Sequence, residues 1–188
     1  DPGDTIYLSA STNPSRKLKY TWEITKRKEG FVGINTHRTN RIVEEAIVNS
    51  KIPEISDLYL VKREAKCLDS RFDFLLGRKD NDKPIWLEVK NVTLLEESGH
   101  LYFPDSVSQR GLKHLLDLKK CCLKGERAII FFLINRDHGE CFSPAKHIHK
   151  EYAQALEQAH EAGVEILAYK TKMSITEINI DKPITIKL

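Results

Sequence analysis

The most informative stretch of this chain is SRFDFLLGRKDNDKPIWLEVKNVTL, residues 70–94. Two apolar runs flank the polar segment GRKDNDKP, a pattern typical of a β-hairpin. Asp73, Glu88 and Lys90 stand inside the apolar runs, where charge is not expected. Burying a charge is costly unless it is paired or binds a metal ion. The hairpin is therefore expected to form either a structural ion pair or a functional site.

The turn sets which side chains of the hairpin meet. If the strands are symmetric about Asp80 and Asn81, Asp73 faces Glu88 directly, with Cβ atoms roughly 5 Å apart. Lys90 is two residues beyond Glu88 and falls on the same face. A slip of one residue would scatter the three groups over both faces. This register therefore predicts a cluster of two carboxylates and an ammonium.

Such a cluster suits a hard divalent cation. Two neighbouring carboxylates repel each other unless a cation lies between them. Oxygen ligands favour Mg²⁺, with Mn²⁺ as an alternative, and the carbonyl of Val89 is a further candidate ligand. Lys90 would orient a metal-bound water or neutralise charge that builds up on phosphorus. The alternative from the residues alone is a buried ion pair without chemistry.

A second Glu-x-Lys segment shows that this motif alone is weak. Glu64-Ala65-Lys66 lies in a polar context and is interpreted as exposed strand surface. The apolar surroundings and the matched Asp73 distinguish Glu88-Val89-Lys90 from it.

The rest of the chain predicts an α/β fold around the hairpin. Asn40 is a candidate N-cap for a helix that ends at Lys51-Ile52-Pro53, and further helices are expected at 106–124 and 149–162. An antiparallel meander followed by strand–helix–strand units predicts a mixed sheet flanked by helices. The last residues are expected to form an edge hairpin. Strands are predicted at 5–9, 18–25, 31–34, 58–67, 70–77, 84–94, 128–135 and 164–170, with the hairpin at 171–188.

Composition and charge narrow the function classes. The chain of 188 residues is 40% hydrophobic, carries a net charge of +3, and has room for one domain with a small appendage. No apolar run approaches the length of a membrane span, so no membrane partner is expected. Four cysteines without a Cys-x-x-Cys pair indicate free thiols and a cytoplasmic protein.

Two surfaces are candidates for nucleic acid. Arg16, Lys17 and Lys19 are candidate phosphate contacts, which position a protein on DNA but read no sequence. Tyr20 and Trp22 follow them, but they share a face with Leu18 and Ile24. That pattern favours packing in a core over stacking on bases.

The second surface is on the helix at 106–124. Its apolar stripe is expected to be Leu112, Leu115, Leu116, Cys122 and Leu123. Arg110, Lys113 and His114 fall on the other side, as a basic face or simply a solvated one. Gln109 and Arg110, near the helix N-terminus, are candidates to hold a phosphate.

Ordered motifs give the chain a family likeness. They are YTWEI, GINT followed by NRIVEEA, SRFDFLL, LEVKNVTL, FPDSVSQRGLKHLLDL, SPAKHI and AGVEILAY. With these the chain resembles the bacterial sugar fermentation stimulation protein family over essentially its whole length. The resemblance implies a small oligonucleotide-binding (OB) type β barrel, of which residues 1–34 would be the last part. It also implies a PD-(D/E)xK nuclease-like domain at residues 35–188.

The resemblance also implies site residues and a function. The metal carboxylates of the nuclease class fall on Asp73 and Glu88, and its lysine on Lys90. A further acidic ligand is expected on the first helix, where periodicity does not choose between Glu44 and Glu45 and the resemblance favours Glu44. The implied function is DNA binding without sequence specificity, linked to regulation of sugar (maltose) utilisation genes. Nuclease action follows only from the class motif, so a non-catalytic DNA-binding regulator on the same fold is the alternative.

Overall fold

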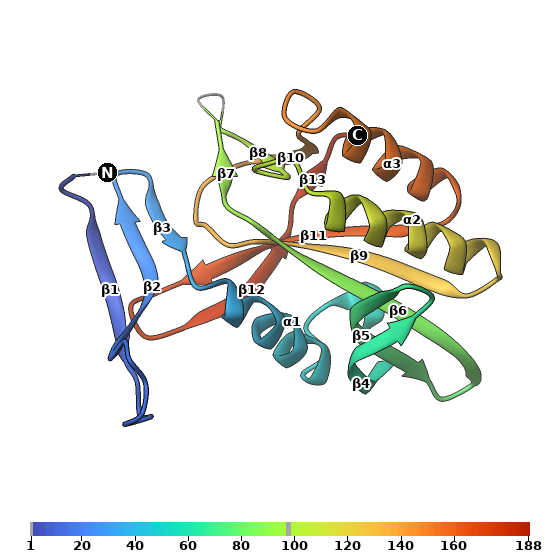
Figure 1. Cartoon of the computed structure of the whole chain (residues 1–188), viewed down its shortest axis with the longest axis horizontal. Helices are drawn as coiled ribbons and strands as arrows, with labels where there is room; N and C mark the ends of the chain where they lie inside the picture. Colours follow the sequence, from blue (N-terminus) through green and yellow to red (C-terminus); the bar gives the residue numbers. More distant parts are fainter. Residues whose placement is uncertain (1, 97–98) are drawn as a thin grey trace.

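The centre of the molecule is a six-stranded mixed sheet with the order β12-β11-β9-β6-β5-β4 (Figure 1). The computed structural model describes residues 2–96 and 99–188. β4, β5 and β6 form an antiparallel meander, while β6, β9 and β11 run parallel, which confirms the predicted mixed sheet. The strands are β4 Leu58–Cys67, β5 Ser70–Arg78, β6 Asn81–Val92, β9 Arg127–Ile134, β11 Glu165–Met173 and β12 Ile178–Pro183.

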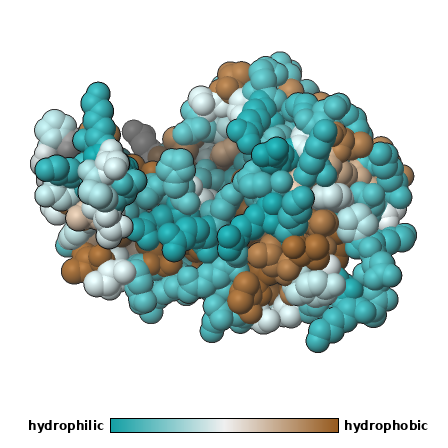
Figure 2. Space-filling model, turned by 60° about the horizontal axis from the view of Figure 1, so that its bottom comes forward, coloured by the Kyte–Doolittle hydropathy of each residue, from teal (hydrophilic) through white to brown (hydrophobic). Residues whose placement is uncertain are grey.

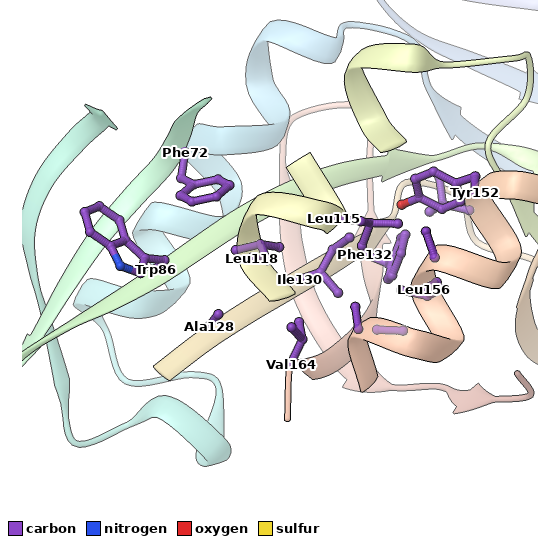
Figure 3. Packing of buried hydrophobic residues seen from close by; sticks show 14 of the residues in the cluster. Phe72, Trp86, Leu115, Leu118, Ala128, Ile130, Phe132, Tyr152, Leu156 and Val164 are labelled. Atoms are coloured by element: carbon purple, nitrogen blue, oxygen red, sulfur yellow. The ribbon is translucent and has the colours of Figure 1, made fainter. Parts of the chain in front are cut away.

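Helices cover both faces of this sheet. α1 (Thr39–Val48) packs on one face, and α2 (Gln109–Leu123) and α3 (Lys150–Glu161) pack on the other (Figure 1). β9 is buried on both faces: Phe131 belongs to the core under α1, and Phe132 to the core under α2 and α3 (Figure 3). This explains why its sequence is a continuous apolar run. No helix in residues 2–96 and 99–188 is long and apolar enough to cross a membrane.

A second sheet was not predicted from the sequence. Its order is β13-β10-β8-β7, and β10 pairs in parallel with both β8 and β13. Strands this short carry no usable periodicity, and their partners lie far away in the chain. The hairpin predicted at 171–188 lies earlier in the chain, where β11 pairs with β12, whereas β13 joins the second sheet. The strands are β7 Leu94–Leu95, β8 His100–Phe103, β10 Cys141–Pro144 and β13 Thr185–Ile186.

The N-terminal strands form a separate antiparallel sheet at one end of the molecule (Figure 1). They are β1 (Thr5–Ala10), β2 (Tyr20–Arg27) and β3 (Gly30–Gly33). The segment after β9 holds this sheet, because Gly33 N donates to Asn135 O at 2.9 Å and Phe31 N donates to Asp137 Oδ2 at 2.9 Å.

One prediction for this sheet is wrong. Tyr20 and Trp22 are 61% and 47% exposed, although Ile24 on the same strand is buried. Within the described residues no second layer covers that end of the face. Figure 2 shows the surface from below, with brown apolar atoms at the left over this sheet and right of centre. The two rings are therefore accessible to a ligand.

Candidate metal and nucleic-acid site

The hairpin has the predicted register over its central part. Phe74 pairs with Leu87 and Leu76 pairs with Ile85. A bulge between Leu76 and Arg78 then shifts the strands, so that Arg78 pairs with Asn81. The turn is therefore not centred on Asp80 and Asn81 as predicted, and the bulge absorbs the difference. Asp73 and Glu88 come directly beyond the Phe74–Leu87 pair, toward the open end of the hairpin.

Asp73 lies where the alternation of β5 breaks. Phe72 packs in the core under α2, but Phe74 packs in the core under α1, although a regular strand would put both on one face. The carboxylate at this break is held from two sides. Oδ2 accepts a hydrogen bond from Val89 N at 2.7 Å, and Oδ1 accepts one from Asn40 Nδ2 at 2.7 Å.

Asn40 is therefore a partner of Asp73 and not the predicted N-cap. Asn35 instead caps a 3-10 helix, η1 (Thr36–Arg38), by accepting a hydrogen bond from His37 N. This short helix runs directly into α1, so Asn40 lies inside the first turn. A second 3-10 helix, η2 (Pro53–Ile55), follows α1.

Glu88 is buried and carries most of the contacts of the site. Its Oε1 accepts hydrogen bonds from Lys90 Nζ at 2.6 Å and from His114 Nδ1 at 2.5 Å. Its Oε2 is buried and has no hydrogen-bond partner among the described residues. Since a carboxylate only accepts, the proton of the His114 contact is on Nδ1. Glu88 thus contacts α2 through His114, whereas Asp73 contacts α1 through Asn40 and the backbone of β6 through Val89.

The two carboxyl groups have opposite pKa shifts. Burial raises the pKa of Asp73 to about 6, and the negative charge of Glu88 adds to this. Burial also acts to raise the pKa of Glu88, but the hydrogen bond from His114 and the charge of Lys90 outweigh it and hold that pKa below its usual value. Glu88 is therefore ionised at neutral pH, and Asp73 would be ionised more readily beside a cation.

The acidic candidates of α1 lie near Asp73. A groove of about 440 Å³ is lined by Asp73, Glu44 and Glu45, together with Arg63 of β4. Arg63 Nε donates to Glu44 Oε1 at 2.9 Å, and this carboxylate is largely buried, whereas Glu45 is exposed. Both residues thus line the groove, and Glu44 is the one fixed by an ion pair.

The polar face predicted for α2 is wrong at His114. This side chain is 5% exposed, and its ring packs edge-on against Phe72 at 6.0 Å between centroids. Leu116 and Leu123, which were expected in the apolar stripe, are 41% and 70% exposed. The helix is turned about its axis relative to the prediction, because its inner face has to supply a partner for the buried Glu88.

A second polar contact supports this orientation of α2. Asp117 is buried, and Oδ2 accepts a hydrogen bond from Ser70 Oγ at 2.6 Å. Lys113 is exposed but not free, since Nζ donates to the Asp69 carbonyl and to Ser70 Oγ. It therefore ties α2 to the turn between β4 and β5.

The other predicted nucleic-acid contacts are exposed. Gln109 and Arg110 lie in the first turn of α2, which Ser108 caps through a hydrogen bond from Gly111 N at 3.0 Å. Arg16, Lys17 and Lys19 lie between β1 and β2, at the end of the molecule away from α2 (Figure 1). The two groups do not form one continuous cluster.

Tyr152 was missed by the sequence analysis. It is fully buried, its hydroxyl has no hydrogen-bond partner among the described residues, and it packs beside Leu115 and Phe132 (Figure 3). Burial raises the pKa of Tyr152 well above its usual value, and the charge of Glu88 adds to the shift. In the sequence this residue reads only as part of the apolar stripe of α3, so no local signal could have identified it.

Fold and site together define a class of protein. It combines a small antiparallel β domain with an α/β domain whose mixed sheet carries an Asp, a Glu and a Lys around an open hairpin end. The family model described as the Sugar fermentation stimulation protein RE domain matches residues 37–177, and the SfsA N-terminal OB domain matches residues 1–34. The chain belongs to the sugar fermentation stimulation protein family.

A solved structure shows the same fold. The structure of Pyrococcus furiosus SfsA in complex with Ca²⁺ is similar, with a TM-score of 0.89 and 27% sequence identity. The match covers 97% of this chain and 78% of that one. The family resemblance read from the motifs is thus confirmed.

Proposed function

We propose that this protein binds DNA without sequence preference and hydrolyses phosphodiester bonds with a divalent ion, Mg²⁺ or Mn²⁺, held by Asp73 and Glu88. The observation behind this proposal is Oε2 of Glu88, which is buried and has no hydrogen-bond partner among the described residues. The charge of the same carboxylate raises the pKa of Asp73. A cation between the two carboxylates would satisfy both groups. The Ca²⁺ complex of the similar Pyrococcus structure supports a divalent site in this family.

The remaining ligands come from β6 and α1. Val89 N donates to Asp73, so the N–H of Val89 points toward β5. In a strand the N–H and C=O of one residue point to the same side, so the Val89 carbonyl also faces β5. Glu44, in the groove beside Asp73, is the candidate for a further ligand. This set of oxygen donors fits Mg²⁺ or Mn²⁺.

The chain's own residues prepare the reaction. When bound, the ion supplies a Lewis acid and lowers the pKa of a bound water. Lys90, held by Glu88 at 2.6 Å, places an ammonium where it can orient the attacking water or stabilise charge on the phosphate. Asn40 fixes the orientation of Asp73, and His114 fixes that of Glu88.

DNA contacts are proposed at two places. Gln109 and Arg110 are exposed at the N-terminus of α2, where backbone N–H groups favour a phosphate. Arg16, Lys17 and Lys19 would follow the DNA backbone, and the exposed rings of Tyr20 and Trp22 would stack on bases. The proposal places the protein in the cytoplasm, in keeping with its four free thiols, and links it to regulation of sugar utilisation through its family.

A cleavage assay tests the proposal. Plasmid and single-stranded DNA are incubated with the wild type, Asp73→Asn and Lys90→Met, in Mg²⁺, Mn²⁺ or EDTA. We expect metal-dependent cutting that falls by about 10²-fold or more in both variants. Lys66→Met is the matched control, because it removes the exposed lysine of the second Glu-x-Lys segment and leaves cutting unchanged.

Other outcomes separate the alternatives. Binding by all forms with no cutting by any of them supports the DNA-binding regulator. Neither binding nor cutting by the wild type leaves Asp73, Glu88 and Lys90 as a structural ion pair.

A further inference from the structure

Two thiols and a carboxylate converge below the end of α2. Cys67 ends β4, Cys121 lies in the last turns of α2, and Glu126 directly precedes β9. One ligand atom from each of the three lies within 4.8 Å of the others, and the two Sγ atoms are 3.3 Å apart. Cys121 is buried, while Cys67 and Glu126 are partly buried. Segments far apart in sequence thus bring soft and hard donors to one point that solvent reaches.

The carboxylate of this cluster is held in place. Trp86 Nε1 donates to Glu126 Oε2 at 2.7 Å, which fixes the carboxylate beside the two thiols. In Figure 3 the indole nitrogen of Trp86 lies on the edge of the ring turned away from Phe72. Such a hydrogen bond to one oxygen is the usual way in which proteins orient a carboxylate that ligates a metal.

Binding of a cation would change the charges around the thiols. Burial raises the pKa of both thiols, so they are protonated at neutral pH in the absence of a ligand. The nearby Lys124 acts in the opposite direction on Cys67. A divalent cation bound by two thiolates and one carboxylate leaves a net charge of −1. The ammonium of Lys124 would offset that charge.

We propose that Cys67, Cys121 and Glu126 form a zinc site, separate from the Asp73–Glu88 site and independent of the proposed nuclease function. Sγ of both cysteines and a carboxylate oxygen of Glu126 supply three ligands, and a water takes the fourth tetrahedral position. Binding releases the two thiol protons. Zn–S bonds of about 2.3 Å put the sulfurs about 3.8 Å apart, so they separate only by about half an ångström. The ion ties the end of β4 to α2.

Cobalt substitution tests the proposal. Co²⁺ is titrated into the reduced, metal-free protein, and the thiolate-to-cobalt charge-transfer band in the near ultraviolet is followed. We expect a band that saturates at one ion per chain and is displaced by Zn²⁺. Ions at Asp73 and Glu88 have only oxygen ligands and give no such band, so failure here is distinguishable from failure of the proposed function.

Variants assign the ligands. Cys67→Ser and Cys121→Ser are expected to lose the band, and Cys141→Ser, a control thiol elsewhere in the chain, to keep it. Trp86→Phe removes the hydrogen bond to the carboxylate but keeps an aromatic ring in the core, and is expected to weaken Zn²⁺ binding by about 10- to 100-fold. Glu126→Gln keeps both thiols and can still accept the Trp86 hydrogen bond, so it reports on the third ligand even if a serine variant does not fold.

Three metal-binding results would overturn the zinc site. They are a wild type that has four titratable thiols but no band, a band of equal intensity in folded Cys67→Ser, and equal Zn²⁺ affinity of wild type and Glu126→Gln. Peptide mass spectrometry gives a further test. A Cys67–Cys121 cross-linked peptide that is two hydrogens lighter than the two free peptides, found in metal-free protein, would replace the zinc site by a disulfide.

Discussion

Replacing Asp73 by asparagine should stabilise the metal-free protein at neutral pH. Asp73 is buried beside the charged Glu88, so its ionised form is unfavourable in the folded state. Asparagine has the same shape and no charge. Its Oδ1 can accept from Val89 N, and the amide of Asn40 can rotate to accept from its Nδ2. The substitution thus removes the repulsion while keeping both contacts.

The size of the effect follows from the pKa. The carboxyl group titrates at about 6 in the folded protein instead of 3.8. At about 1.4 kcal/mol per unit, the ionised group costs about 3 kcal/mol above pH 6. Between these two values the folded state binds more protons than the unfolded state, so wild-type stability falls as the pH rises. The advantage of Asp73→Asn is therefore near zero at about pH 4 and complete at about pH 7.

Urea unfolding in EDTA measures this difference across the pH range. Asp82→Asn, which removes an exposed carboxylate of the same hairpin, controls for the change in net charge. Added Mg²⁺ should stabilise the wild type and close the gap, because it binds the pair only when Asp73 is ionised. A variant that is less stable than the wild type by the same amount at every pH would refute the reasoning.

Other substitutions test the contacts around the site and the junction of the sheets. His114→Phe keeps the ring packing but removes a hydrogen bond from the buried carboxylate of Glu88, and should cost about 2 kcal/mol in urea unfolding at neutral pH. Hydrogen bonds from Arg38 hold the pKa of Glu23 at about 2, so its contribution is present above pH 4.5 and is lost as the pH falls toward 2. Glu23→Gln should therefore cost about 1–2 kcal/mol at neutral pH, after allowance for the exposed arginine, and flatten the acid-unfolding curve. Gly33→Ala places a Cβ 2.3 Å from the side-chain oxygen of Asn135 and should cost about 1–3 kcal/mol, measured by thermal unfolding.

Local sequence patterns were sufficient for the order of the main elements and for the register of the central part of the hairpin. β5 and β6 are adjacent in the chain and separated by a short turn, so their pairing depends on nearby residues alone. The run AIIFFLIN likewise identified a strand buried on both faces, because such a strand needs apolar side chains at every position. The family followed from the order of motifs along the whole chain.

Contacts between distant segments decided the features that local periodicity does not encode, such as the inner face of α2 and the partners of the buried charges. An apolar stripe predicts the inner face of α2 only if the sheet surface under the helix is apolar. That surface contains Glu88, so α2 places His114 against it. Asn40 leaves its expected capping role because Asp73 approaches from β5. Tyr20 and Trp22 are exposed because, among the described residues, nothing covers their face. A buried charge needs a partner, and an apolar side chain is buried only if another layer covers it. In each case the partner or the covering layer depends on residues far away in the chain.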